Sequence, residues 1–194
     1  MFYPLTFEAN YKDYVWGGRR LADFGKTLPE KGNVAESWEL STHPNGPSII
    51  ANGLFKGKSF HDLIAEHGDQ LLGHGLSERD LDKFPLLIKL IDAKGDLSIQ
   101  VHPDDSYAQV HENGEYGKNE MWIVLDAPED AKLIAGVKPE VTREDFAQAI
   151  ADDRVLDMLE HIPVKRGDFV NIPAGVVHAI TAGLIIYEVQ QNSD

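Results

Sequence analysis

Short runs of apolar and β-branched residues, separated by Gly, Pro and Asp, recur through the middle and the end of the chain. Runs of this length and composition are typical of the strands in β-sandwiches and β-barrels. We therefore expect a mainly β fold, a β-barrel or jelly roll. The expected strands are 34–42, 86–93, 97–103, 119–126, 131–137, 168–172, 176–181 and 184–190.

Two stretches carry helical signals and are expected to form helical insertions in the barrel, near 59–83 and 142–160. The first opens with "SFHD", which resembles a capping box, followed by apolar pairs. In the second, Thr142 can cap a helix in which Phe146 and Ile150 lie four residues apart, on one face.

The length of 194 residues suits one well-buried domain, so we expect residues 1–194 to form a single domain. With 42% hydrophobic and 26% charged residues, the composition is that of an ordinary soluble protein. No apolar run approaches the roughly 18 residues of a membrane span, and the start has no basic segment followed by an apolar one. We expect a cytoplasmic protein that neither enters nor binds a membrane.

The net charge of the chain limits the kinds of ligand that we expect it to bind. Eighteen basic and 32 acidic side chains give a formal charge of −14, which argues against nucleic acid as a partner. A small anionic substrate then needs a local basic group to counter the overall field. Because the chain has no cysteine, any metal must be held by His, carboxylate or amide ligands.

Four side chains in separate β segments stand out as candidates for a site. Gln100 and His102, in "SIQVHPDD", lie two residues apart and therefore share one face of the predicted strand. His178 lies in a return strand that follows a first strand and a Pro-Ala-Gly turn, the arrangement of a hairpin. Glu120 begins an otherwise apolar strand, where it either points to solvent or is buried with a partner.

Each of these signals is weak alone, since an isolated histidine is more often an ordinary polar residue than a ligand. Together they supply the nitrogen and oxygen atoms that suit Zn²⁺ or a related ion with one position left open. For His43, a role in the site and a place in a turn before Pro44 remain equal alternatives. The remaining histidines are expected to be solvated surface residues. The surface group is His61, His67, His74, His111 and His161.

The spacing around His178 resembles the second cupin motif, G(X)5PXG(X)2H, running from Gly167 through Pro173 and Gly175. The terminal Asn position of that motif is Ala182 here. The region from Gln100 to Glu120 resembles a stretched first cupin motif with Gln in place of the first His. These similarities imply a cupin-type jelly-roll barrel.

Longer matches narrow the family. The segments "WGGRRL", "ESWELS", "FPLLIKLIDAKGDLSIQVHPDD", "GKNEMWIVLDA" and "IPAGVVHAI" resemble type I mannose-6-phosphate isomerase, the phosphomannose isomerases, over nearly the whole chain. The resemblance implies zinc-assisted interconversion of mannose 6-phosphate and fructose 6-phosphate through a cis-enediol. It also implies that the zinc ligands are Gln100, His102, Glu120 and His178.

The same resemblance implies that Ser98, Lys118 and Glu188 line the substrate cleft. Lys118 is our first candidate for the proton-transferring base, with a phosphate contact as the alternative of similar weight. For Trp16 and Glu39, which lie in matching motifs, we expect core packing and a solvated strand position. Asp104 and Asp105 follow Pro103 and are expected to form a solvated turn.

The family also has a β-rich C-terminal domain, carrying an arginine at the active site, that we expect to be absent from this chain. On that basis we expect metal binding with reduced or absent turnover in the isolated chain. Two alternatives stay open: a metal-holding cupin that binds a sugar phosphate without turnover, and another cupin-type sugar-phosphate isomerase. The sequence does not determine the oligomeric state.

Overall fold

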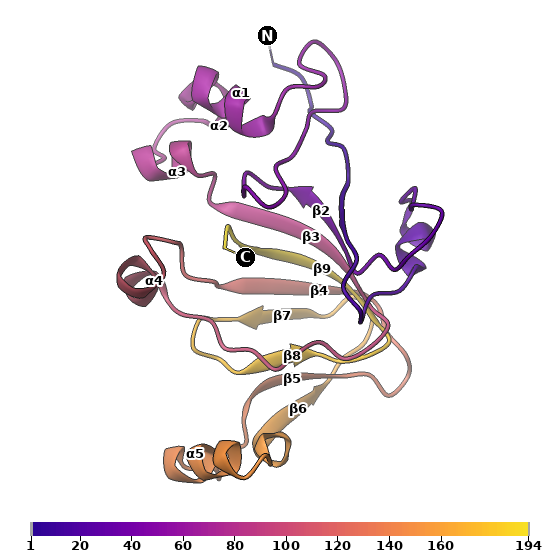
Figure 1. Cartoon of the computed structure of the whole chain (residues 1–194), viewed down its shortest axis with the longest axis vertical. Coiled ribbons are helices and arrows are strands. Elements are labelled where there is room, and N and C mark those ends of the chain that lie inside the picture. Colours follow the sequence, from indigo (N-terminus) through magenta and orange to yellow (C-terminus); the bar gives the residue numbers. More distant parts are fainter. Residues whose placement is uncertain (1, 194) are drawn as a thin grey trace.

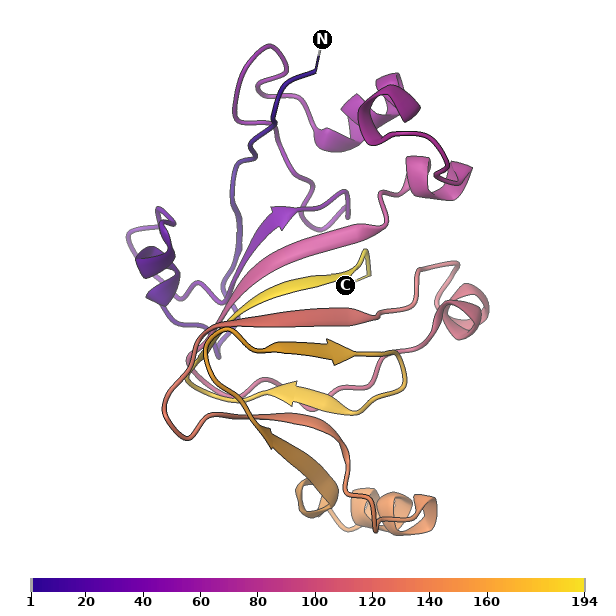
Figure 2. The same cartoon turned by 180° about the vertical axis from the view of Figure 1, so that it is seen from behind.

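In the computed structural model, which describes residues 2–193, two antiparallel sheets face each other. In Figures 1 and 2 the strands of the two sheets lie one above another. β7, at the edge of the larger sheet, is drawn next to β8, at the edge of the smaller sheet. The larger sheet has the order β1 (Asn10–Lys12), β2 (Glu36–Leu40), β3 (Leu86–Ala93), β9 (Leu184–Gln191), β4 (Glu120–Asp126) and β7 (Phe169–Ile172). The smaller sheet has the order β6 (Leu159–Pro163), β5 (Lys132–Val137) and β8 (His178–Ile180).

The main core fills the space between the two sheets. Inward-facing residues of the larger sheet, among them Ile91, Trp122 and Ile186, pack with Leu133 and Ile180 of the smaller sheet. Each of these side chains is at most 3% exposed. Because alternate residues of a strand face inward, the polar residues at the same inner positions farther along β3, β4 and β9 point into the same interior. The mainly β, cupin-type barrel expected from the sequence is confirmed.

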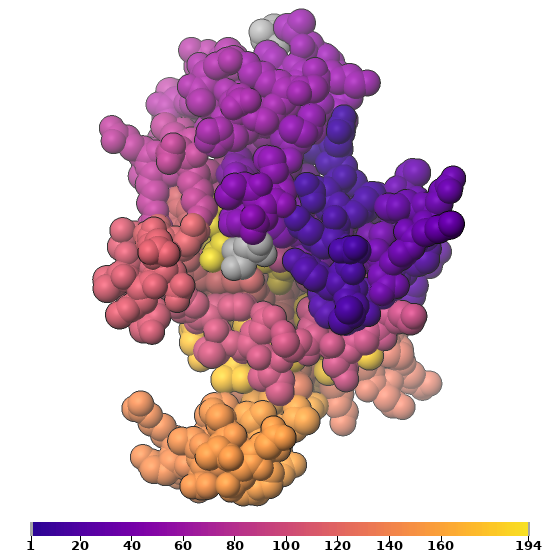
Figure 3. Space-filling view, viewed as in Figure 1, coloured from indigo at the N-terminus to yellow at the C-terminus, as the bar shows by residue number. Residues whose placement is uncertain are grey.

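Helices decorate the ends and outer faces of this barrel (Figure 1). The short helices α1 (Phe60–His67), α2 (Asp69–Leu72) and α3 (Glu78–Asp82) lie at one end, and α5 (Arg143–Ala151) lies at the other. In the space-filling view α5 belongs to an orange lobe at the lower end (Figure 3). Three further elements are α4 (Asp105–His111), η1 (Arg20–Phe24) and η2 (Val155–Met158). None of the helices in the described residues has the length and apolar character to span a membrane.

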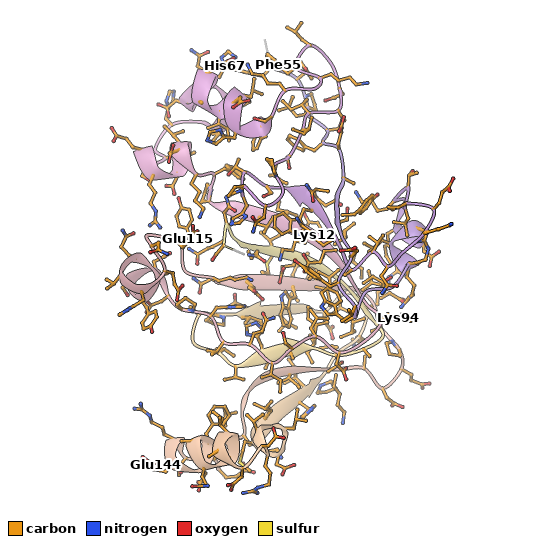
Figure 4. The ribbon with its side chains drawn as sticks, viewed as in Figure 1. Lys12, Phe55, His67, Lys94, Glu115 and Glu144 are labelled. Atoms are coloured by element: carbon orange, nitrogen blue, oxygen red, sulfur yellow. The ribbon has the colours of Figure 1, made fainter. Side chains whose placement is uncertain are left out.

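Aromatic packing holds the insertion at the N-terminal end together. Phe55, in the loop before α1, and His67, at the end of α1, lie near each other (Figure 4), with ring centroids 5.9 Å apart. Tyr3 stacks on Phe55 at 5.7 Å, and Phe2 lies edge-on to His67 at 5.2 Å. The N-terminal segment is thereby packed against this insertion.

Seven of the eight expected strands are present within one or two residues at each end, but the strand expected at 97–103 is not. Gln100 and His178 exchange two backbone hydrogen bonds of 2.9 Å, forming an isolated bridge. Continuing this register would place Ser98 opposite Ile180, whereas Leu97 N is the group that donates to Ile180 O. The register slips by one residue, so no continuous ladder forms.

Both expected helical insertions exist, but their helices are shorter than expected. Gly68, with φ 39° and ψ −116°, separates α1 from α2. The second helix ends at Ala151, and residues 159 and 160 already belong to β6. On α5, Phe146 packs against a small core cluster and Ala149 is buried, while Ile150 is 58% exposed.

The two aspartates after Pro103 do not form a solvated turn. Asp104 is the N-cap of α4 and accepts a hydrogen bond from Tyr107 N at 2.8 Å, which lowers the pKa of its carboxyl group. Asp105 begins that helix and accepts a hydrogen bond from Gly117 N at 2.8 Å. The pair thus starts a helix that the sequence pattern did not predict.

We predict that Leu133→Ala destabilises the fold by about 2–5 kcal/mol, because Leu133 is fully buried between the sheets and its truncation leaves a cavity. The matched control is Leu156→Ala on η2, where leucine is 59% exposed, with an expected change within about 0.5 kcal/mol. Urea unfolding followed by circular dichroism measures both. Equal effects of the two substitutions would contradict the placement of the core.

Candidate metal and substrate site

A cleft of about 370 Å³ opens between the sheets, above the apolar core. Its apolar lining includes Ile91, Leu97 and Ile180, and charged and polar side chains line it as well. The polar and ionisable residues that line it are Tyr14, Glu36, Lys89, Ser98, Gln100, His102, Lys118, Glu120, His178 and Glu188. All seven site residues expected from the sequence therefore border one cavity.

Within the described residues, a histidine–carboxylate–histidine group in this cleft has the geometry to hold a metal ion. His102, Glu120 and His178 each offer one ligand atom, and these atoms lie within 4.8 Å of one another. His102 Nε2 lies 3.1 Å from Glu120 Oε1, and His178 Nε2 lies 3.6 Å from Glu120 Oε2. The residues come from three different segments: the loop before α4, the start of β4 and the start of β8.

The ring of His178 is oriented for ligation by its own backbone. Its Nδ1 lies 2.9 Å from Val176 O, and a carbonyl can only accept, so Nδ1 carries the hydrogen. The lone pair is then on Nε2, which points toward Glu120. Burial lowers the pKa of His178, which favours the neutral ring that a metal requires.

The donor set fits a cation. Burial opposes ionisation of Glu120, but the contact with His102 and the charges of Lys118 and His178 prevail and lower its pKa to about 2. His102 Nε2 is buried without a hydrogen-bond partner, although it lies close to Glu120. A buried imidazole nitrogen without a hydrogen-bond partner, beside an ionised carboxylate, is the arrangement that a divalent ion satisfies.

Gln100 and Ser98 lie beside this group at the edge of the cleft. Gln100 Nε2 donates to Ser98 Oγ at 2.8 Å, so the amide nitrogen is used within the protein. The amide oxygen is the atom that a cation takes from glutamine. The bridge between Gln100 and His178 fixes the two backbones against each other.

Lys118 and Glu188 complete the expected set. Lys118 Nζ lies 3.8 Å from Glu120 Oε1, with its side chain 13% exposed. Glu188 is buried and accepts a hydrogen bond of 2.7 Å from Trp122 Nε1, which also donates to Glu120 at 3.1 Å. Burial, reinforced by the charge of Glu120, raises the pKa of Glu188 to about 7, so this carboxyl group can hold a proton near neutral pH.

Sequence reasoning missed Lys89 and Glu36, two further ionisable residues in the cleft. Lys89 Nζ lies 3.5 Å from Glu188 Oε2 and 3.7 Å from Glu36 Oε2, and all three side chains are buried. Trp38 Nε1 donates to Glu36 at 2.7 Å. The available signal was the single lysine within the apolar run "LLIKLIDA", because such a residue is buried only with a partner.

The remaining predictions from the sequence, for Trp16, Glu39 and His43, had different outcomes. Trp16 packs against the main core, as expected, and also lines the cleft. Glu39 is partly buried rather than solvated, and it accepts from Ser37 Oγ at 2.6 Å and pairs with Lys26. His43 is buried in a turn, with its Nδ1 accepting from Asn45 N at 3.2 Å, and it does not line the cleft.

Two antiparallel sheets around a cleft with ligating side chains define a cupin-type barrel with a candidate metal centre. Residues 5–142 match the family described as phosphomannose isomerase type I, catalytic domain. The chain belongs to the type I phosphomannose isomerase family.

Curated and solved relatives agree with this membership. Mannose-6-phosphate isomerase ManA of Bacillus subtilis (strain 168) is 42% identical over 191 residues. A crystal structure of the mannose 6-phosphate isomerase from Bacillus subtilis superposes with a TM-score of 0.90 at 40% identity, covering 98% of this chain and 59% of that chain. A zinc-bound mannose 6-phosphate isomerase shares the fold, with a TM-score of 0.74 at 18% identity, covering 98% of this chain and 68% of that one. The chain spans 58% of the length of the ManA relative.

We predict that His178→Ala lowers the affinity for Zn²⁺ at least tenfold, because it removes a buried ring nitrogen that the backbone orients toward Glu120 in the candidate metal site. His161→Ala, which removes an exposed histidine on β6, is the control and should bind zinc like the unsubstituted chain. Competition with a chromophoric chelator gives the affinities, and elemental analysis gives the stoichiometry. Unchanged zinc content in His178→Ala would refute the ligand role.

Proposed function

We propose that residues 1–194 form one catalytic domain that interconverts mannose 6-phosphate and fructose 6-phosphate with the help of Zn²⁺. The observation that supports this most strongly is the convergence of His102, Glu120 and His178 with Lys118 in one cleft of the family's fold. The substrate is taken from the named activity of the relatives. A cytoplasmic location stays a prediction from the sequence.

Four side chains are proposed to hold the zinc ion: Gln100, His102, Glu120 and His178. His102 and His178 supply ring nitrogens, Glu120 a carboxylate oxygen, and Gln100 its amide oxygen, a donor set without sulfur. When bound, the ion supplies a Lewis acid that polarises the sugar carbonyl and stabilises negative charge on oxygen.

Lys118 is proposed to move the proton of the isomerisation. In its amine form, Lys118 accepts the proton from C2 of the open-chain aldose, and the C2–H electron pair becomes the C1–C2 double bond of an enediolate. A proton then moves from the hydroxyl oxygen on C2 to the oxygen on C1, and the same group returns its proton to C1, which leaves the ketose carbonyl at C2 and a hydroxyl group at C1. Its position in the cleft, 3.8 Å from Glu120, places it beside the proposed metal ligands.

Glu188 and Lys89 are proposed to contact the sugar oxygens. The ammonium group of Lys89 is fixed between Glu188 and Glu36 and offers a positive charge to an oxyanion in the cleft. Glu188 has a raised pKa, about 7, which suits a group that exchanges a proton with a hydroxyl oxygen. Ser98, at the edge of the cleft, is proposed to bind the substrate through its hydroxyl group.

We predict that the chain, supplied with Zn²⁺, converts mannose 6-phosphate to fructose 6-phosphate at a lower rate than a full-length relative, and that EDTA abolishes the product. A coupled assay that detects fructose 6-phosphate through glucose 6-phosphate measures the reaction. Zinc binding without turnover would reduce the proposal to a sugar-phosphate-binding domain. Reaction with glucose 6-phosphate alone, measured by direct detection of the fructose 6-phosphate formed, would replace mannose 6-phosphate as the substrate.

Lys118→Ala is expected to retain zinc while turnover falls by about 10²–10⁴-fold, the usual contribution of a positioned acid–base group. Lys31→Ala, which changes an exposed lysine that does not line the cleft, is the matched control and should leave both quantities unchanged. Turnover and zinc stoichiometry are measured on the same preparations. Loss of zinc from a folded Lys118→Ala chain would move Lys118 out of the proton-transfer role.

A further inference from the structure

Three polar side chains at the rim of the barrel are joined to one another by hydrogen bonds. Gln191, the last residue of β9, places its amide between Asp105 and Asn119. Its Nε2 lies 3.1 Å from Asp105 Oδ1 and 3.3 Å from Asp105 Oδ2. Its Oε1 accepts from Asn119 N at 3.0 Å and from Asn119 Nδ2 at 2.5 Å. We call Asp105, Asn119 and Gln191 the amide clasp.

The clasp joins the loop after His102 to the segment before Glu120. Asp105 Oδ1 accepts from Gly117 N at 2.8 Å, and Lys118 N donates to Pro103 O at 3.0 Å. Gly117 lies so close to this loop that a Cβ atom would stand 2.6 Å from Asp105 N. The two backbones are therefore in direct contact, and the clasp closes over that contact.

The clasp also reaches the third ligand-bearing segment. Asn119 Oδ1 accepts from Ala174 N at 2.9 Å, in the turn that leads into His178. The next residue, Gly175, donates its N–H to His102 O at 2.8 Å. The segments that carry His102, Glu120 and His178 are thus tied together through side chains that are not among the proposed ligands.

We propose that Asp105, Asn119 and Gln191 are positioning residues, which hold the three ligand-bearing segments in place before a metal ion binds. The inference rests on the proposed metal site. A ligand set whose backbones are already fixed loses less conformational freedom on binding, so its affinity is higher. Outer-shell partners of this kind typically change metal affinity by about 10–100-fold when removed.

Global stability depends little on the clasp. Asp105 and Asn119 are exposed, and hydrogen bonds in such positions add little to folding. β9 is held independently by its ladders with β3 and β4, which run along most of its length. Removal of one clasp side chain should therefore loosen the metal site and leave the barrel folded.

The experiment compares Gln191→Ala with Gln148→Ala in the full chain. Gln148 is a matched control because its Nε2 also donates to an exposed aspartate, Asp152 Oδ1 at 2.9 Å, on α5. We expect Gln191→Ala to bind Zn²⁺ at least tenfold more weakly and to alter the visible spectrum of bound Co²⁺. Gln148→Ala should match the unsubstituted chain in both, and the metal-free melting temperatures of all three should agree.

A pair of substitutions at Asp105 separates positioning from a general loss of structure. Asp105→Asn keeps the oxygen that Gly117 and Gln191 contact and should retain near-normal zinc affinity, whereas Asp105→Ala should lose at least tenfold. Normal zinc affinity in Gln191→Ala would refute the positioning role of the amide clasp and leave the proposed metal site in place. Lower metal-free melting in Gln191→Ala and Asp105→Ala, without rescue by asparagine, would also overturn it. An unsubstituted chain that binds no zinc would overturn the metal site, and the clasp with it.

Discussion

The structure depends on the compensation of three carboxylates that β-strands carry into the interior of a barrel. Glu36, Glu120 and Glu188 are each at most 7% exposed. An uncompensated carboxylate at such a place costs several kcal/mol, so each has cationic or donor groups around it. Lys89 lies between Glu36 and Glu188, while two histidines and Lys118 surround Glu120. The cleft is the part of the barrel where these groups replace an apolar filling.

The sequence predicted the barrel well where a strand is defined by its own residues. The strand expected at 86–93 has the same bounds as β3, because its largely apolar side chains define a buried strand within the segment itself. The run 97–103 failed because a ladder also needs a partner in register, and the one-residue slip against β8 is not visible in the segment itself. Likewise, α4 was missed because it has only seven residues and because Asp104 and Asp105, directly after Pro103, were interpreted as a solvated turn.

For the site, the residues expected from the family resemblance all border the cleft, and the ones missed are explained by distance along the chain. The two that were missed, Glu36 and Lys89, meet the expected Glu188 because the sheet order β2-β3-β9 places their three strands side by side. Local patterns cannot reveal such a contact. The role of Asp105 was hidden for the same reason, because its partner Gln191 lies 86 residues away.

Trp122 has a single N–H group, and two acidic side chains use it. Its Nε1 lies 3.1 Å from Glu120 Oε2 and 2.7 Å from Glu188 Oε1, one of which belongs to the proposed metal ligands and the other to the proposed sugar contacts. One hydrogen atom cannot serve two acceptors fully, so the carboxylates compete for it. A substitution of Glu120 or Glu188 therefore changes two positions at once, because the indole N–H of Trp122 then donates fully to the carboxylate that remains.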